Sequence, residues 1–290
     1  MKILENISLS KLCTFGIGGD ARYLINIKTK EDLKEALAFA TEKQLPIFVL
    51  GGGSNIVLPD EGINGVVLRM MNNNISATNN EIEIESGANW TKIMSFCKQN
   101  NIYGMETFSG LPGTMGGAIF GNAGCHGVET KDLLLRIEIW DSKSGEFRWI
   151  DAKAVEFRYR WSEFKTQPEW IIWSCTMQIS KNADDATADP KKLYEFRQER
   201  QPQGLTTGSF FKNPEINAAG QLIDQCGLKG LRKGNVEVST KHANFFMNVG
   251  GATAKDVDDL ALEVQKVVKD KTGVCLEKEV LKIDTSGRIL

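Results

Sequence analysis

The sequence predicts an α+β fold. Short runs that alternate apolar and polar residues, such as Arg22–Ile27 and Glu81–Glu85, are typical of strands. Other segments, such as Glu31–Lys43, carry an apolar residue every three or four positions and are typical of helices. The number of short strands mixed with helices favours the α+β class, and the sequence shows neither an internal repeat nor a low-complexity segment.

Composition limits the possible classes of function. The chain has 290 residues, a length typical of two domains or three small ones. Its net charge of −2 argues against nucleic-acid binding. No apolar run approaches the roughly 20 residues of a membrane-spanning helix, and the N-terminus lacks the apolar core of a signal peptide. The six cysteines are scattered, so we expect reduced thiols in a cytoplasmic protein.

The first of two glycine-rich segments that could bind a ligand is the loop Gly51–Asn55, which follows a short buried strand, Pro46–Leu50. The loop Gly51–Asn55 fits neither common phosphate-binding pattern. Ile56 stands where a dinucleotide-binding loop has its third glycine, and no lysine follows as in a Walker A loop. More strand is predicted after it. Backbone amides of successive glycines can still bind a phosphate, so a tight turn and an anion site both stay open.

A second cluster, Gly110–Gly127, follows a predicted helix, Trp90–Gln99, and holds seven glycines in 18 residues. Each glycine costs roughly 0.5–1 kcal/mol inside a regular element. A flat or phosphate-bearing ligand lying against the backbone therefore explains the cluster better than packing does. We interpret His126 as a hydrogen-bonding wall residue in preference to a catalyst.

Two segments carry arginines in pairs. A hairpin is predicted from Leu133–Trp140 and Phe147–Ile150, and a central strand from Trp170–Ile179. Between them, Arg158 and Arg160 share one face if the segment is extended. Such a pair is either a solvated basic edge or partly buried among the neighbouring aromatic residues, and a buried arginine needs an anion.

The second pair lies on a predicted helix, Pro190–Arg200, which follows a polar linker and is capped by Asp189. Arg197 and Arg200 are one turn apart on it. They match either the helix dipole or an anionic ligand, and both interpretations stay open.

The segment Gly204–Pro214 places Ser209 after a glycine that tolerates positive φ and before a proline that ends regular structure. Ser209 is therefore presented on a shaped loop, with Lys212 and Asn213 within reach of the same space. A hydroxyl held this way is a nucleophile, a proton donor or a turn former. The segment alone favours the turn former.

The C-terminal part ends in a long helix and a strand. The helix begins at a capping box formed by Thr253 and Asp256 and ends at a glycine. The final strand, Val274–Ile283, carries Glu277 and Glu279 on one face. Both carboxylates are solvated unless that face lines a cleft. A short helix and a strand are predicted before them, Ala218–Cys226 and Lys241–Asn248.

Six motifs resemble, in order and nearly end to end, those of the UDP-N-acetylenolpyruvoylglucosamine reductase family. Each motif is weak alone, but six in the right order are specific. They are Thr14–Gly19, Leu50–Asn55, Gly110–Ala118 with Asn122–Gly124, Tyr159–Lys165, Gly208–Pro214 and Leu276–Val280.

The resemblance implies a two-subdomain FAD-binding module of the PCMH/vanillyl-alcohol-oxidase type and a C-terminal α+β substrate-binding domain. The expected division is 1–67, to which 274–290 return, then 68–200, and 201–273. FAD would bind non-covalently, without a metal. The residues expected to bind it are Leu50, Gly51, Gly52, Gly53, Ser54, Asn55, Gly113, Thr114, Gly116, Gly117, Ala118, Asn122 and Gly124.

The implied reaction is the NADPH-dependent reduction of UDP-N-acetylenolpyruvoylglucosamine to UDP-N-acetylmuramate through FAD, in peptidoglycan synthesis. Hydride addition to the enolpyruvyl ether spreads negative charge into its carboxylate, and the adjacent carbon then takes a proton. Ser209 matches the family's proton donor, and Arg160 and Glu279 match the groups that stabilise the charge. The expected contacts to the substrate's diphosphate or carboxylate are Arg197, Arg200, Lys212 and Asn213. We expect a monomer with small-molecule partners only.

Three features depart from the family pattern. His126 stands where tyrosine is usual. Together with the preceding Cys125, it opens an alternative to non-covalent binding, a covalent link to the flavin. Cys13 stands where asparagine often precedes the first motif. The segment between Arg160 and Ser209 is short, which indicates the branch without an additional tyrosine-bearing loop.

Two other functions stay open. A flavin oxidase or dehydrogenase of the same superfamily, acting on another sugar or alcohol, keeps the glycine loops but gives no reason for Ser209, Arg160 and Glu279. A non-catalytic flavin- or nucleotide-binding module is the third interpretation.

Overall fold

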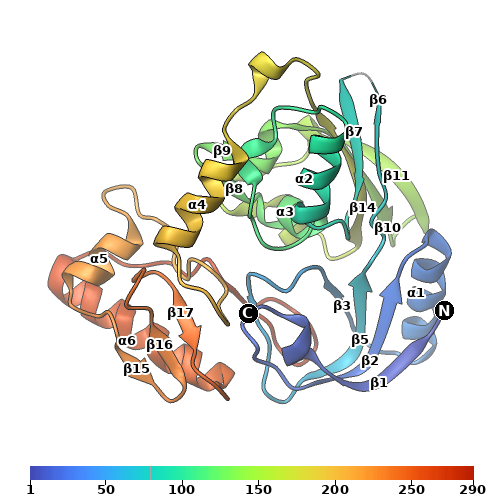
Figure 1. Ribbon diagram of the computed structural model, residues 1–290. Coiled ribbons are helices and arrows are strands. Elements are labelled where there is room, and N and C mark those ends of the chain that lie inside the picture. The colour runs from blue at the N-terminus through green and yellow to red at the C-terminus, as the bar shows by residue number, and fades with distance from the viewer. Residues whose placement is uncertain (79) are drawn as a thin grey trace. The chain divides into compact units, whose positions relative to one another are not determined.

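The computed structural model describes residues 1–78 and 80–290. The chain forms two compact units (Figure 1). Unit 1 consists of Met1–Ile25, Lys34–Leu68 and Gln198–Leu290, and unit 2 of Asn26–Leu33 and Arg69–Arg197. The division into 1–67, 68–200 and 201–273 stays a prediction. Within the described ranges, no helix is long and apolar enough to cross a membrane.

The N-terminal part of unit 1 is built on a four-stranded sheet in the order β1-β2-β5-β3, with β1 antiparallel to β2. Its elements are β1 (Ile3–Ser8), β2 (Asp20–Ile27), α1 (Lys30–Glu42), β3 (Ile47–Leu50), β4 (Ile56–Val57) and β5 (Ile63–Met70), and β2, α1 and β5 each extend into residues of unit 2. Leu24, Leu50 and Val67 are among the buried side chains of its core. Strand structure after the first glycine loop, as β4 and β5, confirms that no dinucleotide-binding helix follows it.

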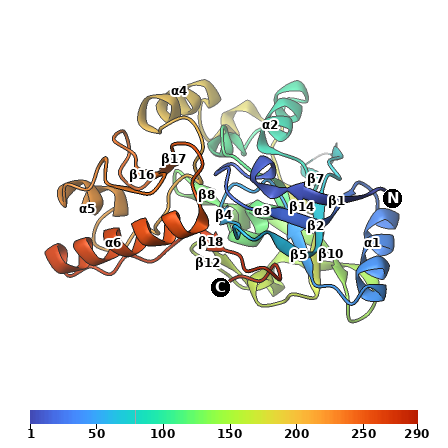
Figure 2. The ribbon, with the colours of Figure 1, turned by 90° about the horizontal axis from the view of Figure 1, so that it is seen from below.

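The C-terminal part of unit 1 contains a small sheet, β15-β16-β17, covered by helices α5 and α6 (Figure 2). Its elements are α5 (Ala219–Gln225), β15 (Arg232–Lys233), β16 (Val236–Val238), β17 (Phe246–Asn248), α6 (Ala254–Thr272) and β18 (Leu281–Lys282). Three phenylalanines fill its centre, and the rings of Phe210 and Phe246 stack with centroids 4.1 Å apart. The predicted strand Lys241–Asn248 is shorter, because a turn closes where Phe245 N donates to His242 O at 2.9 Å.

Helix α6 has the predicted ends. Thr253 Oγ1 accepts a hydrogen bond from Asp256 N at 3.1 Å, and Asp256 Oδ2 accepts one from Thr253 N at 3.1 Å. Gly273 closes the helix with φ of 74°. The capping box and the glycine stop, both predicted, are confirmed.

Unit 2 is built on a five-stranded sheet in the order β11-β10-β14-β7-β6. Its elements are β6 (Ile75–Thr78), β7 (Glu81–Glu85), α2 (Trp90–Gln99), α3 (Met115–Gly121), β8 (Gly124–Cys125), β9 (Val128–Glu129), β10 (Leu134–Asp141), β11 (Glu146–Asp151), β12 (Phe157–Arg158), β13 (Trp161–Ser162) and β14 (Trp170–Gln178), and α4 (Pro190–Arg200) runs past its last residue. Helices α2 and α3 lie along one face of the sheet (Figure 1). The β10–β11 hairpin and the central position of β14 confirm the sequence-based expectations.

Helix α3 was not predicted, because it lies inside the glycine-dense segment. A Cβ at Gly116 would come within 2.9 Å of Ser86 Cβ. The missing side chain therefore lets this helix approach the end of β7, and the gain from that packing outweighs the low helix propensity of glycine.

Candidate functional site

The segment Ser209–Lys212 of unit 1 is held on both sides by backbone contacts. On one side Ser209 bridges Phe245, and Phe210 N donates to Asn244 O at 2.7 Å. On the other side Lys212 N donates to Glu277 O at 2.8 Å. The buried rings that follow Ser209 anchor the segment in the core. Ser209 itself is half-buried, on a segment whose position the surrounding backbone sets.

Glu279 joins the serine segment to the first glycine loop. Its backbone N–H donates to Phe210 O at 2.9 Å, and its carbonyl accepts a hydrogen bond from Asn55 Nδ2 at 3.3 Å. Leu281 N also donates to Asn55 O at 3.1 Å, and β18 runs parallel to β4. Unit 1 therefore brings three predicted site residues together, Ser209, Glu279 and Asn55. The predicted final strand Val274–Ile283 is wrong in extent, because only Leu281–Lys282 form a strand.

The first glycine loop has a structural reason for Gly53. Its φ is 61°, and a Cβ there would lie 2.5 Å from Leu12 O and 2.7 Å from Cys13 Cα. Thr14 N donates to Gly53 O at 3.0 Å. The loop is thus seated on the Thr14 motif by a close backbone contact that only glycine permits.

Lys212 and Asn213 both have partners within unit 1. Lys212 forms an ion pair with Glu277, whose side chain is 72% exposed. Asn213 Oδ1 accepts a hydrogen bond from Ala219 N at 3.0 Å, at the start of α5. Asn213 therefore helps to begin a helix, and its amide group is only partly available to a ligand.

In unit 2, three buried hydroxyls gather around α3 and the turn before it. Thr107, Ser109 and Thr114 have Oγ atoms without a hydrogen-bond partner among residues 1–78 and 80–290. A buried polar atom left without a partner costs about 1–3 kcal/mol. A Cβ at Gly117 would meet only Thr114 Oγ1, at 3.7 Å, and a Cβ at Gly121 would meet nothing within 4 Å. Unpaired hydroxyls beside open glycine faces fit a polar cofactor with flat surfaces, and FAD is such a group.

Asn122 closes α3 in the left-handed conformation, with φ of 45°. Its Nδ2 donates to Glu129 Oε2 at 3.0 Å and to Arg158 O at 2.9 Å, and its Oδ1 accepts from Lys131 N at 3.2 Å. The Asn122 side chain thus has hydrogen-bond partners inside unit 2. Its predicted contact to FAD stays a prediction.

The segment of Arg158 and Arg160 is not extended, so the two arginines do not share the face that an extended strand would give them. Residues 157–162 form a hairpin of two short strands, β12 and β13, and Arg160 sits in the turn between them with φ of 56°. Arg158 is exposed and pairs with Glu156, with 2.6 Å between Nη2 and Oε1. Arg160 is half-buried, and its Nη1 donates to Gly124 O at 3.0 Å. The turn therefore separates the two arginines and directs Arg160 toward the β8–β9 hairpin.

Arg160 and Arg197 meet at Cys125, a residue that the sequence brought to the site only through the question of a covalent flavin link. The Cys125 thiol donates to Thr107 O at 2.9 Å. Burial raises the pKa of this thiol, and the nearby Arg197 and Arg160 partly offset that effect. Arg197 Cδ would lie 3.2 Å from a Cβ at Gly110, so this glycine admits the arginine. Arg200 is exposed at the end of α4 in unit 1.

His126 is a turn residue, and its interpretation as a hydrogen-bonding wall residue stays a prediction. It has φ of 52° in the β8–β9 hairpin and is exposed, and its ring meets Phe196 edge-on at 5.9 Å. The hydroxyls of Thr107 and Ser109 were also missed by sequence reasoning. The available signal was small hydroxyl residues directly before a glycine-dense segment.

Two family models match this chain. The model of the UDP-N-acetylenolpyruvoylglucosamine reductase C-terminal domain matches residues 201–283, and an FAD binding domain model matches residues 21–151. The first covers Ser209 and Glu279, and the second covers both glycine clusters. The matched ranges therefore contain most of the predicted site residues.

Whole-chain comparisons agree with these models. The UDP-N-acetylenolpyruvoylglucosamine reductase of Fusobacterium nucleatum is 33% identical over 97% of this chain and 99% of its own length. That of Carboxydothermus hydrogenoformans is 38% identical over 96% of this chain and 94% of its own length. The crystal structure of the reductase from Thermus caldophilus matches with a TM-score of 0.83 and 30% identity, over 97% of this chain and 99% of that one. The chain belongs to the UDP-N-acetylenolpyruvoylglucosamine reductase family.

Proposed function

We propose that this chain reduces UDP-N-acetylenolpyruvoylglucosamine to UDP-N-acetylmuramate with NADPH, as an FAD-dependent oxidoreductase of peptidoglycan synthesis. The similarity to the reductases, which extends over nearly the whole chain, carries this proposal. The FAD binding domain match and the unfilled polar surface around α3 support the cofactor. Bound FAD supplies a hydride relay between the nicotinamide and the enolpyruvyl group. On the protein side, Thr107, Ser109 and Thr114 are the hydroxyls that would hold it, together with the predicted glycine loops.

Ser209 is the proposed proton donor to the carbon that becomes the lactyl centre. A serine hydroxyl is a poor acid in water, so it acts only at short range on a strongly basic centre. The backbone contacts on both sides of Ser209 support this role, because they hold the main chain that carries the hydroxyl in place without help from the substrate.

Glu279 and Arg160 are the proposed groups that stabilise the negative charge. Charge that spreads into the substrate carboxylate is stabilised by donors and positive charge already in place. The Arg160 bond to Gly124 O supports a preformed position for the guanidinium, and the two backbone hydrogen bonds at Glu279 support a fixed place for its main chain.

Arg197, Arg200, Lys212 and Asn213 are the proposed contacts to the diphosphate or carboxylate. Arginine and lysine bind such groups through charge-assisted hydrogen bonds. Lys212 must leave Glu277 to do so. That exchange is inexpensive, because an ion pair with an exposed partner contributes little.

The predicted domain division, 1–67 with 274–290, 68–200 and 201–273, belongs to the same proposal. So do the monomeric state and the cytoplasmic location. A monomer in the cytoplasm is compatible with the two proposed substrates, a nucleotide sugar and NADPH. Both are small molecules, and binding them needs neither a second chain nor a membrane.

The test is an anaerobic titration of the purified protein. NADPH is expected to bleach the flavin absorbance, and UDP-N-acetylenolpyruvoylglucosamine is then expected to restore it. Bleaching that the sugar nucleotide fails to reverse would point to another flavin oxidase or dehydrogenase. A colourless protein that releases no flavin on denaturation would point to a non-catalytic binding module.

A further inference from the structure

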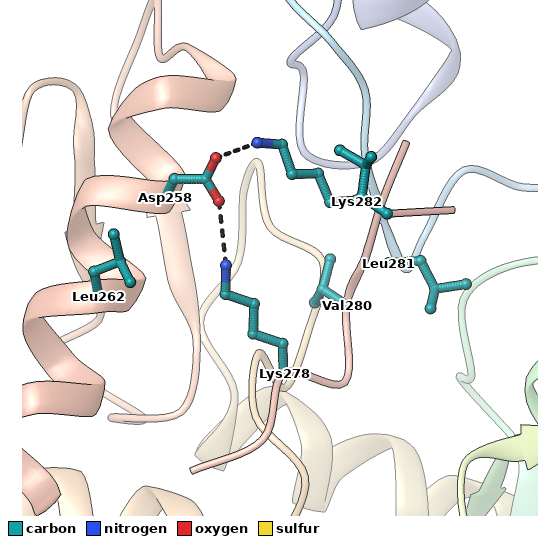
Figure 3. A pocket seen from close by; sticks show the side chains of 7 residues that line it. Asp258, Leu262, Lys278, Val280, Leu281 and Lys282 are labelled. Carbon is teal, nitrogen blue, oxygen red and sulfur yellow. Dashed lines mark hydrogen bonds and ion pairs between the residues drawn. The ribbon is translucent and has the colours of Figure 1, made fainter. Parts of the chain in front are cut away.

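One carboxylate holds two lysines that flank Glu279. Asp258, on α6, accepts a hydrogen bond from Lys278 Nζ at 3.2 Å through Oδ1, and it pairs with Lys282 through Oδ2 (Figure 3). The side chains of Asp258, Lys278 and Lys282 are 27%, 32% and 38% exposed. Burial acts to raise the pKa of Asp258, but the bonds from Lys282 and Lys278 outweigh it and lower the pKa. The carboxylate therefore stays charged over the whole neutral range.

The backbone between the two lysines is irregular. The N–H groups of Glu279 and Val280 both point at Phe210 O, at 2.9 and 3.5 Å. Two successive N–H groups that face one carbonyl are typical of a bulge, which bends a strand and redirects its side chains. The regular pairing of β18 with β4 begins only at Leu281. Strand pairing therefore specifies the direction of the Glu279 side chain only weakly, which leaves a role for the contacts that its neighbours in the chain make.

The two lysines that bind Asp258 lie on either side of this irregular segment in the chain. Figure 3 shows Lys278 and Lys282 reaching the same carboxylate from two points on the chain, with Val280 between them. Val280 is buried in the core that α6 also lines. These three residues belong to the lining of a pocket of about 510 Å³. Both lysines of that lining already have a carboxylate partner, so the cluster fits a structural clamp better than an anion site.

We propose that Asp258 is a positioning residue for the reduction: by holding Lys278 and Lys282 together, it sets the bulge at Glu279 and so the direction of the Glu279 carboxyl. This inference rests on the proposed function of Glu279. Asp258 acts through the two lysines and contacts neither substrate nor cofactor. Its removal acts on the half-reaction that uses Glu279 and leaves the reduction of the flavin by NADPH unchanged.

The test compares Asp258→Asn with Asp259→Asn in the FAD-loaded protein. Asp259 is the matched control, since it lies on the same helix and pairs with a lysine, Lys255, on that helix alone. Both half-reactions are followed anaerobically. Asp258→Asn is expected to slow flavin reoxidation at saturating sugar nucleotide by roughly tenfold or more, since small misplacements cost up to about a hundredfold. Flavin reduction by NADPH and the KM for the sugar nucleotide are expected to stay within about twofold in both variants.

A second variant separates positioning from loss of structure. Asp258→Glu keeps the charge and is expected to restore most of the reoxidation rate. Wild-type reoxidation in Asp258→Asn, an equal loss in both half-reactions, or an equal loss in Asp259→Asn overturns the inference and leaves the proposed function intact. If the reduced flavin of the unmodified protein is not reoxidised by UDP-N-acetylenolpyruvoylglucosamine at all, the proposed function fails first, and the inference fails with it.

Discussion

The Ser209 segment of unit 1 and the α3 segment of unit 2 are built in opposite ways. Around Ser209, backbone groups on both sides find partners at 2.7–2.9 Å. Around α3, three buried hydroxyls lack a partner in the described part of the chain, and a Cβ at Gly121 would face open space. The backbone of the first segment is held without a ligand, as the position of the proposed proton donor requires. The second leaves interactions for a ligand to make, as a cofactor surface requires.

The largest effect is expected at the Ser209 segment. Ser209→Ala removes the proposed proton donor without touching the backbone bonds that hold the segment. Flavin reoxidation by the sugar nucleotide should fall by about 10²–10⁴-fold, while flavin reduction by NADPH should be unchanged. Anaerobic stopped-flow absorbance measures both steps. Ser286→Ala, in a C-terminal turn, is the control. Unchanged reoxidation in Ser209→Ala would remove Ser209 from the mechanism.

Two glycines extend the comparison to the first glycine loop of unit 1, which contacts the Ser209 segment through Glu279, and to α3 of unit 2. Gly53→Ala forces a side chain onto Leu12 O from a positive φ, so it should destabilise the FAD-free protein by more than about 2 kcal/mol. Gly121→Ala has room and no positive φ, and should stabilise the same protein by about 0.5–1 kcal/mol. If that open space receives FAD, Gly121→Ala should nevertheless bind FAD more weakly. Denaturant unfolding and FAD titration test the pair. Equal FAD affinity in Gly121→Ala would place the cofactor elsewhere.

The unpaired hydroxyls predict a similar reversal of sign. Thr114→Val removes a buried hydroxyl that lacks a partner in residues 1–78 and 80–290, so the FAD-free protein should gain about 1 kcal/mol. FAD binding should weaken by about tenfold, since one hydrogen bond to the ligand is lost. Thermal unfolding with and without FAD measures both effects. A loss of stability without FAD would show that Thr114 has a protein partner.

The smallest effect concerns the helix on which Asp258 lies. Burial acts to raise the pKa of Asp256, but hydrogen bonds from Thr253 and Asn235 outweigh it and lower the pKa. A lowered pKa stabilises the folded protein at pH values above the ordinary carboxyl pKa. This stability is lost as the pH falls through the pKa of the folded state. Asp256→Asn should therefore cost about 0.3–1 kcal/mol at neutral pH and nothing in strong acid. A cost that does not depend on pH would contradict a role for the charge.

The sequence predicted elements whose signals are local. The capping box of α6, its glycine stop and the β10–β11 hairpin all depend on residues close together in the chain, and the structure contains them. Helix α3 was missed, because its glycines predict the opposite. The packing of Gly116 against Ser86, which is 30 positions away in the chain and therefore invisible to local propensity, stabilises that helix.

The candidate site divides in the same way. The motif order alone identified the family and both glycine loops, because each motif is a short run of residues in a set sequence. Only the tertiary structure decided that Asn55, Ser209 and Glu279 share one network of backbone bonds, since these contacts join segments up to 224 positions apart. It also decided that Arg160 occupies a turn with positive φ, where its carbonyl accepts a hydrogen bond from Lys165 Nζ at 2.8 Å. Composition and spacing determine which residue types are available, whereas hydrogen bonds and packing between distant segments decide which of them meet.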